Sequence, residues 1–449
     1  KDKAYFNVGN YYFANKKSAH ALKWYSKVDA YTLSESNKNE LNFKMGYAFL
    51  TTRNLDLAKS KFITLINDPK YGNDSRYYFG YISYKQEDYE IAEKTLEEIA
   101  DDQAYKSEVT YYLLDISFKS GKFKKCIEVG KKLLKDAKPK EASEISKIIG
   151  ESYFNLKQYQ ESISYLEAYK GRKGKWNNTD FYQLGYAYFK QKNFEKSVNN
   201  FNKIIDERNN VSQKAYYNLG ECYIYLNKKP EALNAFKSAS EMSFDLTIRE
   251  DAALNYAKLS YEEGNPYKSV TLVLREFLEK YPKSSSYEEI NELLVTSYLY
   301  QQDYQGALNF LKNKKSKQNQ NLTNEISYYR AIQLFNLNKF QEALPYFENA
   351  KKSIDNTIKV MAHYWNGEAN YRLKNFQSSI LEFGEFKKVA PSESHELKLI
   401  DYQIGYSYFK LEEYSSAALA FQNFIETKIN NTSLSDDAII RLGDCFFAT

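Results

Sequence analysis

The sequence predicts an all-α protein in which one helix pair is repeated about twelve times and a thirteenth pair begins. Three observations support this fold class. Glycine and proline are scarce, with 17 Gly and 7 Pro among 449 residues, so few residues interrupt helices. A small residue recurs every 34 to 38 residues, and a second small residue follows most of these positions twelve residues later. A period of that length holds two helices and their turns but no strand.

The first small position lies inside the first predicted helix of each pair. In most repeats it is glycine, as in FYQLGYAYFKQKNFEKSVNNF at residues 181–201, where Gly185 interrupts an aromatic, helix-spaced run. The thirteen positions are Gly9, Gly46, Gly80, Leu114, Gly150, Gly185, Gly220, Ala257, Val295, Ala331, Gly367, Gly405 and Gly443. Glycine inside a helix costs about 0.5–1 kcal/mol relative to alanine, so a close contact must compensate for it.

The second predicted helix contains the other small residue. This residue is Ala21, Ala58, Ala92, Cys126, Ser162, Ser197, Ala232, Ala307, Ala343, Ser379 or Ala417, and the eighth repeat has Val270 one residue late. A large apolar residue follows four positions later in most repeats, although Gly130 does not fit this pattern. We expect Gly185 to face Ser197 where the two helices approach closely, with Tyr188 and Phe201 filling the seam between neighbouring pairs.

This pattern resembles the tetratricopeptide repeat, whose consensus is W-x2-L-G-x2-Y, then A-x3-F and a closing proline. Two successive units match it at Leu184, Gly185, Tyr188, Ser197 and Phe201, and at Leu219, Gly220, Tyr223, Ala232 and Phe236. The resemblance implies a right-handed α-α superhelix, or solenoid, that is stabilised locally along its length.

The repeats divide the chain without a break in composition. They form one continuous array over residues 1–449, with repeats that begin near residues 2, 39, 73, 107, 143, 178, 213, 250, 288, 324, 360, 398 and 436. Both ends of the sequence fall inside a repeat unit. We therefore expect the chain to be a segment of a longer protein.

The sequence offers no candidate catalytic, cofactor or metal site. Cys126, Cys222 and Cys445 lie far apart and lack a C-x-x-C spacing, and the three histidines are equally scattered. No P-loop, dinucleotide-binding or zinc-protease motif occurs. We predict a non-catalytic protein that uses no cofactor and no metal. No run of about 18 apolar residues predicts a membrane span.

The predicted partner-binding residues are tyrosines of the first helices. In the family, the residues three before, one after and four after the glycine position line the concave face. The aromatic residues that we predict to bind a partner are Tyr77, Tyr81, Tyr111, Tyr182, Tyr186, Tyr217, Tyr328, Tyr364, Tyr402 and Tyr406. Tyrosine combines a large apolar area with a hydroxyl group, which suits an interface. The alternative is that these rings only pack between neighbouring helices.

The favoured function is a protein-protein interaction scaffold that binds a protein or peptide within a multiprotein complex. Segments 362–391 and 436–447 are similar to repeats of periplasmic bacterial proteins that organise outer-membrane assembly and the Tol-Pal system. We therefore expect a component of a bacterial cell-envelope assembly or secretion complex, periplasmic or outer-membrane-associated.

Three other functions stay open. They are a cytoplasmic adaptor, an RNA- or glycan-binding helical-repeat protein, and a regulatory array attached to a catalytic domain outside this segment. The 63 Lys and Arg nearly balance the 58 Asp and Glu, and this balance argues against a nucleic-acid partner. A lysine cluster over 312–317 is interpreted as a solvated link between repeats.

Overall fold

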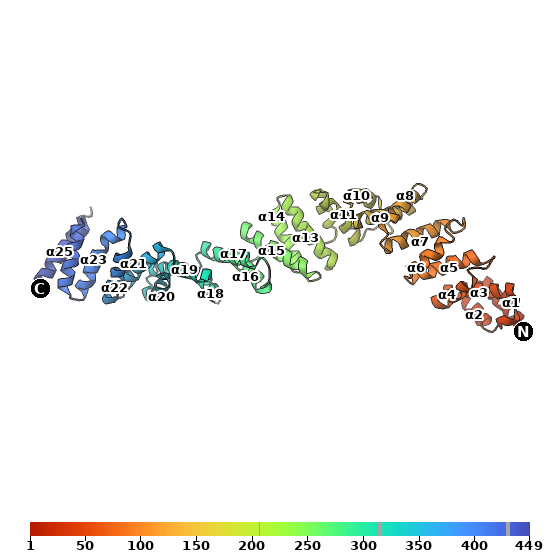
Figure 1. Cartoon of the computed structure of the whole chain (residues 1–449), viewed down its shortest axis with the longest axis horizontal. Coiled ribbons are helices and arrows are strands. Elements are labelled where there is room, and N and C mark those ends of the chain that lie inside the picture. Colours follow the sequence, from red (N-terminus) through yellow and green to blue (C-terminus); the bar gives the residue numbers. More distant parts are fainter. Residues whose placement is uncertain (206, 313–316, 428–431) are drawn as a thin grey trace. The chain divides into compact units, whose positions relative to one another are not determined.

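The computed structural model describes residues 1–205, 207–312, 317–427 and 432–449 (Figure 1). Regular structure in these ranges consists of twenty-five α-helices and the short 3-10 helices η1 (Ala30–Thr32) and η2 (Ile63–Leu65). The described ranges contain no strand, and one isolated bridge joins Arg172 to Lys175. The predicted all-α class is confirmed.

The helices follow one another as pairs, an odd-numbered first helix and an even-numbered second helix. The first helices are α1 (Asp2–Ala14), α3 (Glu35–Thr51), α5 (Gly72–Lys85), α7 (Lys106–Lys119), α9 (Pro139–Asn155), α11 (Asn178–Lys190), α13 (Asn210–Tyr225), α15 (Leu246–Glu263), α17 (Tyr287–Tyr300), α19 (Lys317–Asn336), α21 (Asn356–Arg372), α23 (His395–Lys410) and α25 (Thr432–Ala448). The second helices are α2 (Ser18–Tyr25), α4 (Leu55–Phe62), α6 (Tyr89–Glu97), α8 (Phe123–Leu134), α10 (Tyr159–Ala168), α12 (Phe194–Phe201), α14 (Lys229–Ser240), α16 (Val270–Lys280), α18 (Tyr304–Leu311), α20 (Phe340–Ala350), α22 (Phe376–Val389) and α24 (Tyr414–Glu426).

The chain divides into two compact units, Lys1–Tyr256 and Ala257–Thr449, which are called unit 1 and unit 2 below. Within each unit, a helix packs mainly on the helices that precede and follow it in the sequence. The core is consequently a row of local clusters. One such cluster in unit 1 joins Phe201 of α12 to Ala215 and Leu219 of α13. Stability that is built from neighbouring contacts is typical of repeat proteins.

The repeat glycines make room for one large side chain of the second helix. A methyl group added at Gly185 would lie 2.9 Å from Cε1 of Phe201, and one added at Gly220 would lie 2.6 Å from Cε1 of Phe236. The same relation, sixteen residues apart, pairs Gly9 with Tyr25, Gly46 with Phe62, Gly80 with Leu96, Gly150 with Leu166, Gly367 with Phe383 and Gly405 with Phe421. The burial of these large apolar side chains compensates for the glycine.

The small residue of the second helix contacts the backbone of the first. The Ser197 hydroxyl donates to the Gly185 carbonyl at 2.7 Å, and Ser162 makes the same bond to Gly150 at 2.8 Å. Gly185 thus meets Ser197 through its carbonyl group, as expected, but the side chain that fills the space above its Cα is Phe201. Phe201 therefore packs inside its own pair as well as against the next one.

In the fourth repeat the large and the small residue have changed places. Leu114 stands at the glycine position of α7, and Gly130 stands sixteen residues later, where other repeats have a large residue. Both are buried, and a methyl group at Gly130 would lie 2.7 Å from Cγ1 of Ile149 in α9. In this repeat the glycine therefore lies on the second helix, and it makes room for Ile149 of the next first helix.

Every turn inside a helix pair bends at a residue with a left-handed backbone. This residue lies seven positions after the glycine position, with φ between 55° and 80°. The twelve residues are Lys16, Arg53, Glu87, Gly121, Lys157, Lys192, Asn227, Gly264, Gln302, Asn338, Lys374 and Glu412. Most are not glycine, although this region is unfavourable for residues that carry a Cβ. The shared geometry shows that the pairs are copies of one structural unit.

Side-chain caps begin several helices. Asn177 accepts a hydrogen bond from the backbone of Asp180, whose carboxylate accepts one from the backbone of Asn177, a reciprocal box at the start of α11. The Asn193 side chain caps α12, and the Asp355 carboxylate caps α21. Such caps satisfy amide groups that have no partner inside the helix.

Candidate functional site: an aromatic pocket on the first helices of unit 2

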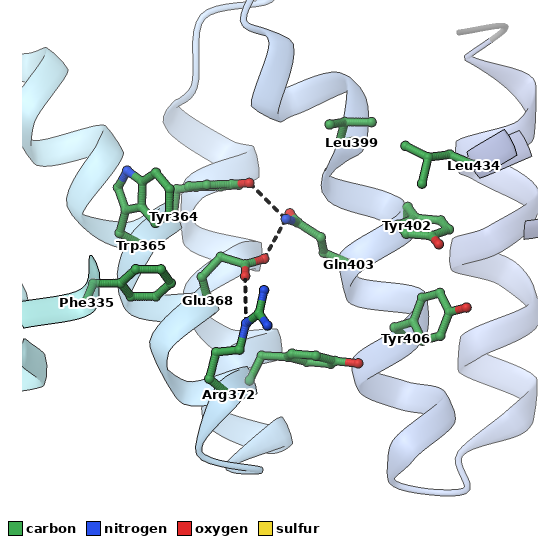
Figure 2. A pocket seen from close by; sticks show the side chains of 11 residues that line it. Phe335, Tyr364, Trp365, Glu368, Arg372, Leu399, Tyr402, Gln403, Tyr406 and Leu434 are labelled. Carbon is green, nitrogen blue, oxygen red and sulfur yellow. Dashed lines mark hydrogen bonds and ion pairs between the residues drawn. The ribbon is translucent and has the colours of Figure 1, made fainter. Parts of the chain in front are cut away.

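First helices α19, α21, α23 and α25 of unit 2 enclose a pocket of about 560 Å³ (Figure 2). The residues that line it are Phe335, Tyr364, Trp365, Glu368, Tyr371, Arg372, Leu399, Tyr402, Gln403, Tyr406 and Leu434. Six of these side chains are aromatic. Pockets of this size with few polar groups are typical ligand sites.

The repeat register aims these side chains at one face. Tyr402 and Tyr406 are four residues apart on α23, so they lie on the same side of that helix. Gly405 of the same helix packs instead against Phe421 of the second helix α24. The glycine contact therefore fixes which side of α23 faces the pocket.

A polar network crosses the pocket from α21 to α23. The Nε2 atom of Gln403 donates to the Tyr364 hydroxyl at 2.9 Å and to Oε1 of Glu368 at 2.6 Å (Figure 2). The other carboxylate oxygen of Glu368 lies 3.9 Å from Nε of Arg372. Burial raises the pKa of Glu368, and Arg372 acts in the opposite direction. The Glu368 carboxylate thus has one cation nearby, at 3.9 Å, and lies among aromatic side chains.

The two tyrosines of α23 are tied to the next first helix. The hydroxyl groups of Tyr402, at 2.9 Å, and of Tyr406 donate to the same oxygen of Asp437 in α25. Arg441 lies 3.5 Å from the other oxygen of that carboxylate. Burial acts to raise the pKa of Asp437, but the two hydroxyls and Arg441 outweigh it and hold the pKa below its usual value. These hydroxyls join neighbouring repeats, while the rings still line the pocket.

The predicted tyrosines of α11 and α13 in unit 1 pack on their own chain. Tyr182 stacks on Tyr186 with ring centroids 5.8 Å apart and lies 5.7 Å from Phe201. Tyr217 contacts the Phe236 ring, 5.8 Å away, and burial raises its pKa to about 12. All three predicted tyrosines remain partly exposed.

The other predicted tyrosines differ in exposure. Tyr77 stacks on Tyr105 at 4.5 Å, Tyr81 lies 5.7 Å from Tyr112, and Tyr328 lies 5.7 Å from Tyr329. Tyr111 is the most accessible of the ten, with 38% of its surface exposed, and Tyr364 is the least, with 9%. The structure brings three of the ten, Tyr364, Tyr402 and Tyr406, together in one pocket. The binding role of all ten stays a prediction.

The sequence analysis missed the polar residues of this pocket. Glu368 directly follows the glycine position of its repeat, a slot at which only aromatic residues were predicted to bind. Gln403 stands two residues before the next glycine position, outside the slots considered. A search for buried acids at the groove slots could have found Glu368. Its pairing with Gln403 is visible only in three dimensions.

The remaining chemistry of the chain is sparse. The three cysteines are buried free thiols, and burial raises the pKa of Cys222 to about 11. Within the described ranges, no three His, Cys, Asp or Glu residues gather as metal ligands. No helix in the same ranges is both long and apolar enough to cross a membrane. Lys314 and Lys315 of the lysine cluster lie outside the described residues.

Comparison with known proteins agrees with the helix-pair structure. Residues 181–210 and 213–245, which hold the pairs α11–α12 and α13–α14, match the tetratricopeptide repeat. No curated protein matches the sequence.

Solved structures of repeat proteins align with parts or all of the chain. One of them, described as MamA MSR-1, is 20% identical over 38% of this chain and 96% of its own, with a TM-score of 0.34. YrrB, described as a TPR protein with an unusual peptide-binding site, is 16% identical over 44% of this chain and 97% of its own, with a TM-score of 0.36. Yeast Tom70 is 12% identical over 99% of this chain and 96% of its own, with a TM-score of 0.26.

The two matched pairs have structural copies along the chain. The left-handed turn of α11–α12 and α13–α14, at Lys192 and Asn227, recurs at the same position in the ten other complete pairs. The buried small residue twelve positions after the glycine position recurs in most of them. Residues 181–210 and 213–245 therefore match tetratricopeptide repeats, and the other complete pairs share their turn and most share their small residue.

Proposed function

We propose that the chain is a non-catalytic scaffold that holds a protein or peptide segment on its first-helix face, with the pocket of unit 2 as an anchoring site. The observation that carries this proposal is the aromatic pocket that four successive first helices line. Large aromatic side chains dominate the energetics of protein interfaces when a partner covers them.

An extended segment suits this arrangement. The pocket residues come from helices of successive repeats, so a segment that follows the row of first helices contacts each repeat in turn. The aromatic rings supply apolar area, and Glu368 and Gln403 supply polar groups that fix orientation. The tyrosines of unit 1, Tyr182, Tyr186 and Tyr217, are proposed as a second contact region for a partner.

The test is selection of peptides by the purified full chain from a phage-displayed library of random 12-residue peptides. Tyr371, a pocket residue of α21, is replaced by alanine, and Tyr300, which is 91% exposed at the end of α17, is replaced as the matched control. We expect Tyr371→Ala to remove binding of the selected peptides and Tyr300→Ala to retain it. Failure to enrich any peptide, or equal binding by both variants, would contradict the proposal.

We further propose that this scaffold acts in a bacterial cell-envelope assembly or secretion complex, in the periplasm or at the outer membrane. The support is the similarity of segments 362–391 and 436–447 to envelope repeat proteins. Fractionation of the native cells by osmotic shock, with periplasmic and cytoplasmic marker enzymes followed in parallel, tests this location. Recovery of the protein with the cytoplasmic marker would favour the adaptor alternative.

A further inference from the structure

Two repeats, one in each unit, share a largely buried glutamate that interacts with a glutamine of the next first helix. Glu151 and Glu368 each follow the glycine of their repeat, and Gln183 and Gln403 each stand two residues before the next one. Gln403 donates to Glu368 at 2.6 Å, and Gln183 acts to lower the pKa of Glu151 against the effect of burial. In both glutamines the amide oxygen is buried and no described group donates to it. The two repeats therefore contain the same glutamate–glutamine pair.

In unit 1 the glutamate of this pair already lies near a cation of the chain itself. Nζ of Lys147 lies 3.9 Å from Glu151 and 2.5 Å from Oδ1 of Asp180. The same ammonium lies 4.7 Å from the centroid of the Tyr169 ring. Burial acts to lower the pKa of Lys147, but the two carboxylates outweigh it and raise the pKa. Two acids and an aromatic ring thus stabilise the charged lysine.

In unit 2 the internal cation is missing from the equivalent position. Tyr364 stands where the other repeat has Lys147, and Ile400 stands where it has Asp180. The nearby cation is Arg372, whose Nε lies 3.9 Å from Glu368 and whose side chain is 58% exposed. The buried carboxylate, by contrast, is only 14% exposed. Glu368 is therefore shielded from water, whereas Arg372 is not.

We propose that the pocket of unit 2 binds an arginine or lysine side chain of the partner peptide, with Glu368 as its counter-charge and the aromatic rings as its walls. This inference rests on the proposed function. A cation against an aromatic face is stabilised by the ring quadrupole, more strongly when water is excluded. A carboxylate that is buried without a close counter-ion gains most from such a partner. An acidic or apolar side chain would leave Glu368 with only the exposed Arg372, 3.9 Å away.

The pocket composition also predicts how pH acts on this site. Glu368 must be ionised to pair with the incoming cation. Burial raises its pKa from the ordinary value, while Arg372 opposes the shift. The neighbouring charged groups are Glu396, which faces Tyr364, and Asp437 with Arg441 beside the two tyrosines of α23. Peptide affinity therefore falls as the pH drops into the range where Glu368 takes up a proton.

The test uses peptides selected on the full chain from the random 12-residue library, and three variants of the protein. Glu368→Gln keeps the size of the side chain but removes its charge, and we expect about tenfold weaker binding of peptides that contain arginine or lysine. Arg372→Gln removes the internal competitor for the carboxylate, and we expect binding to strengthen by roughly two- to fivefold. Glu385→Gln, at an exposed acid of α22 that pairs with Lys388, is the matched control and leaves binding unchanged.

Changing the peptide as well as the protein gives a double-mutant cycle. Replacing the basic residue by norleucine should weaken binding to the unmodified chain by about tenfold and binding to Glu368→Gln by much less, since the charge pair is already lost. Melting temperatures confirm that the variants are folded. Peptides that need the pocket but lack a basic residue, or equal binding by Glu368→Gln and the unmodified chain, would overturn this inference and leave the scaffold function standing. Absence of any peptide that depends on Tyr371 would instead contradict the scaffold function.

Discussion

The ring of Phe236 occupies the space that a side chain at Gly220 would need, because a methyl group there would lie 2.6 Å from the ring. The contact joins the middle of α13 to α14. It recurs at Gly185 and Phe201 and in other repeats of both units. A larger residue at the glycine position must displace a fully buried aromatic ring.

Substitution of Gly220 by leucine should therefore lower the free energy of unfolding by roughly 1–3 kcal/mol, through overpacking of the helix crossing. Urea unfolding followed by circular dichroism measures the change. Gly384→Leu in α22 is the control, because no atom lies within 4 Å of the added Cβ. Equal losses in the two variants would show that the crossing is not the cause.

The left-handed turn gives a second prediction, at Gly121 between α7 and α8. This glycine has φ of 72° and no atom within 4 Å of an added Cβ, so only backbone strain opposes a side chain. Gly121→Ala should lower stability by about 1 kcal/mol. Gly384→Ala, inside a helix with equally open space, should raise it by about 0.5–1 kcal/mol. Changes of the same sign at the two positions would contradict the role assigned to the turn.

Partly buried tyrosines should make the fold sensitive to alkali. Burial raises the pKa of Tyr78, Tyr84 and Tyr217 to about 12. Tyrosine in an unfolded chain loses its proton near pH 10, whereas these three keep it when the protein is folded. Between these values the unfolded state binds fewer protons, so stability falls as the pH rises.

Helical circular dichroism and tyrosinate absorbance, recorded together across this range, provide the measurement. We expect tyrosinate from the buried residues to appear only as helicity is lost. The Tyr217→Phe variant removes one such group and should lose less stability between pH 10 and 12 than the unmodified chain. Ionisation of all tyrosines near pH 10 with helicity intact would be inconsistent with their burial.

A fourth prediction concerns the proposed partner contacts of unit 1. Simultaneous replacement of Tyr182, Tyr186 and Tyr217 by alanine should abolish capture of the native partner, since truncation of a central interface aromatic typically costs about 2 kcal/mol or more. If these rings bind the partner, the helical signal and the melting temperature are largely retained. Unfolding of the variant would support a packing role, and unaltered capture by a folded variant would exclude this contact region.

The sequence predicted the fold because the repeat signal is local and is written many times. The spacing of Gly185 and Phe201 within one pair, and its copies along the chain, identify the helices and their crossing without knowledge of distant contacts. The all-α class and the resemblance to the tetratricopeptide repeat followed from that spacing. The sequence did not predict the left-handed turn residues, because most of them, such as Lys192 and Glu412, are not glycine. Their backbone conformation follows from the two helices that they join.

The amino-acid sequence by itself determined the helix pairs, the close crossings and the aromatic character of the first helices, since each depends on residues within one repeat. Tertiary structure alone decided which of those aromatic residues share a pocket. It joined Glu368 to Gln403 across successive repeats and turned the hydroxyls of Tyr402 and Tyr406 toward Asp437. These contacts depend on how neighbouring pairs stack. They also depend on which side chain, such as Lys147 or Tyr364, stands beside the glutamate. The periodicity within a single repeat determines neither.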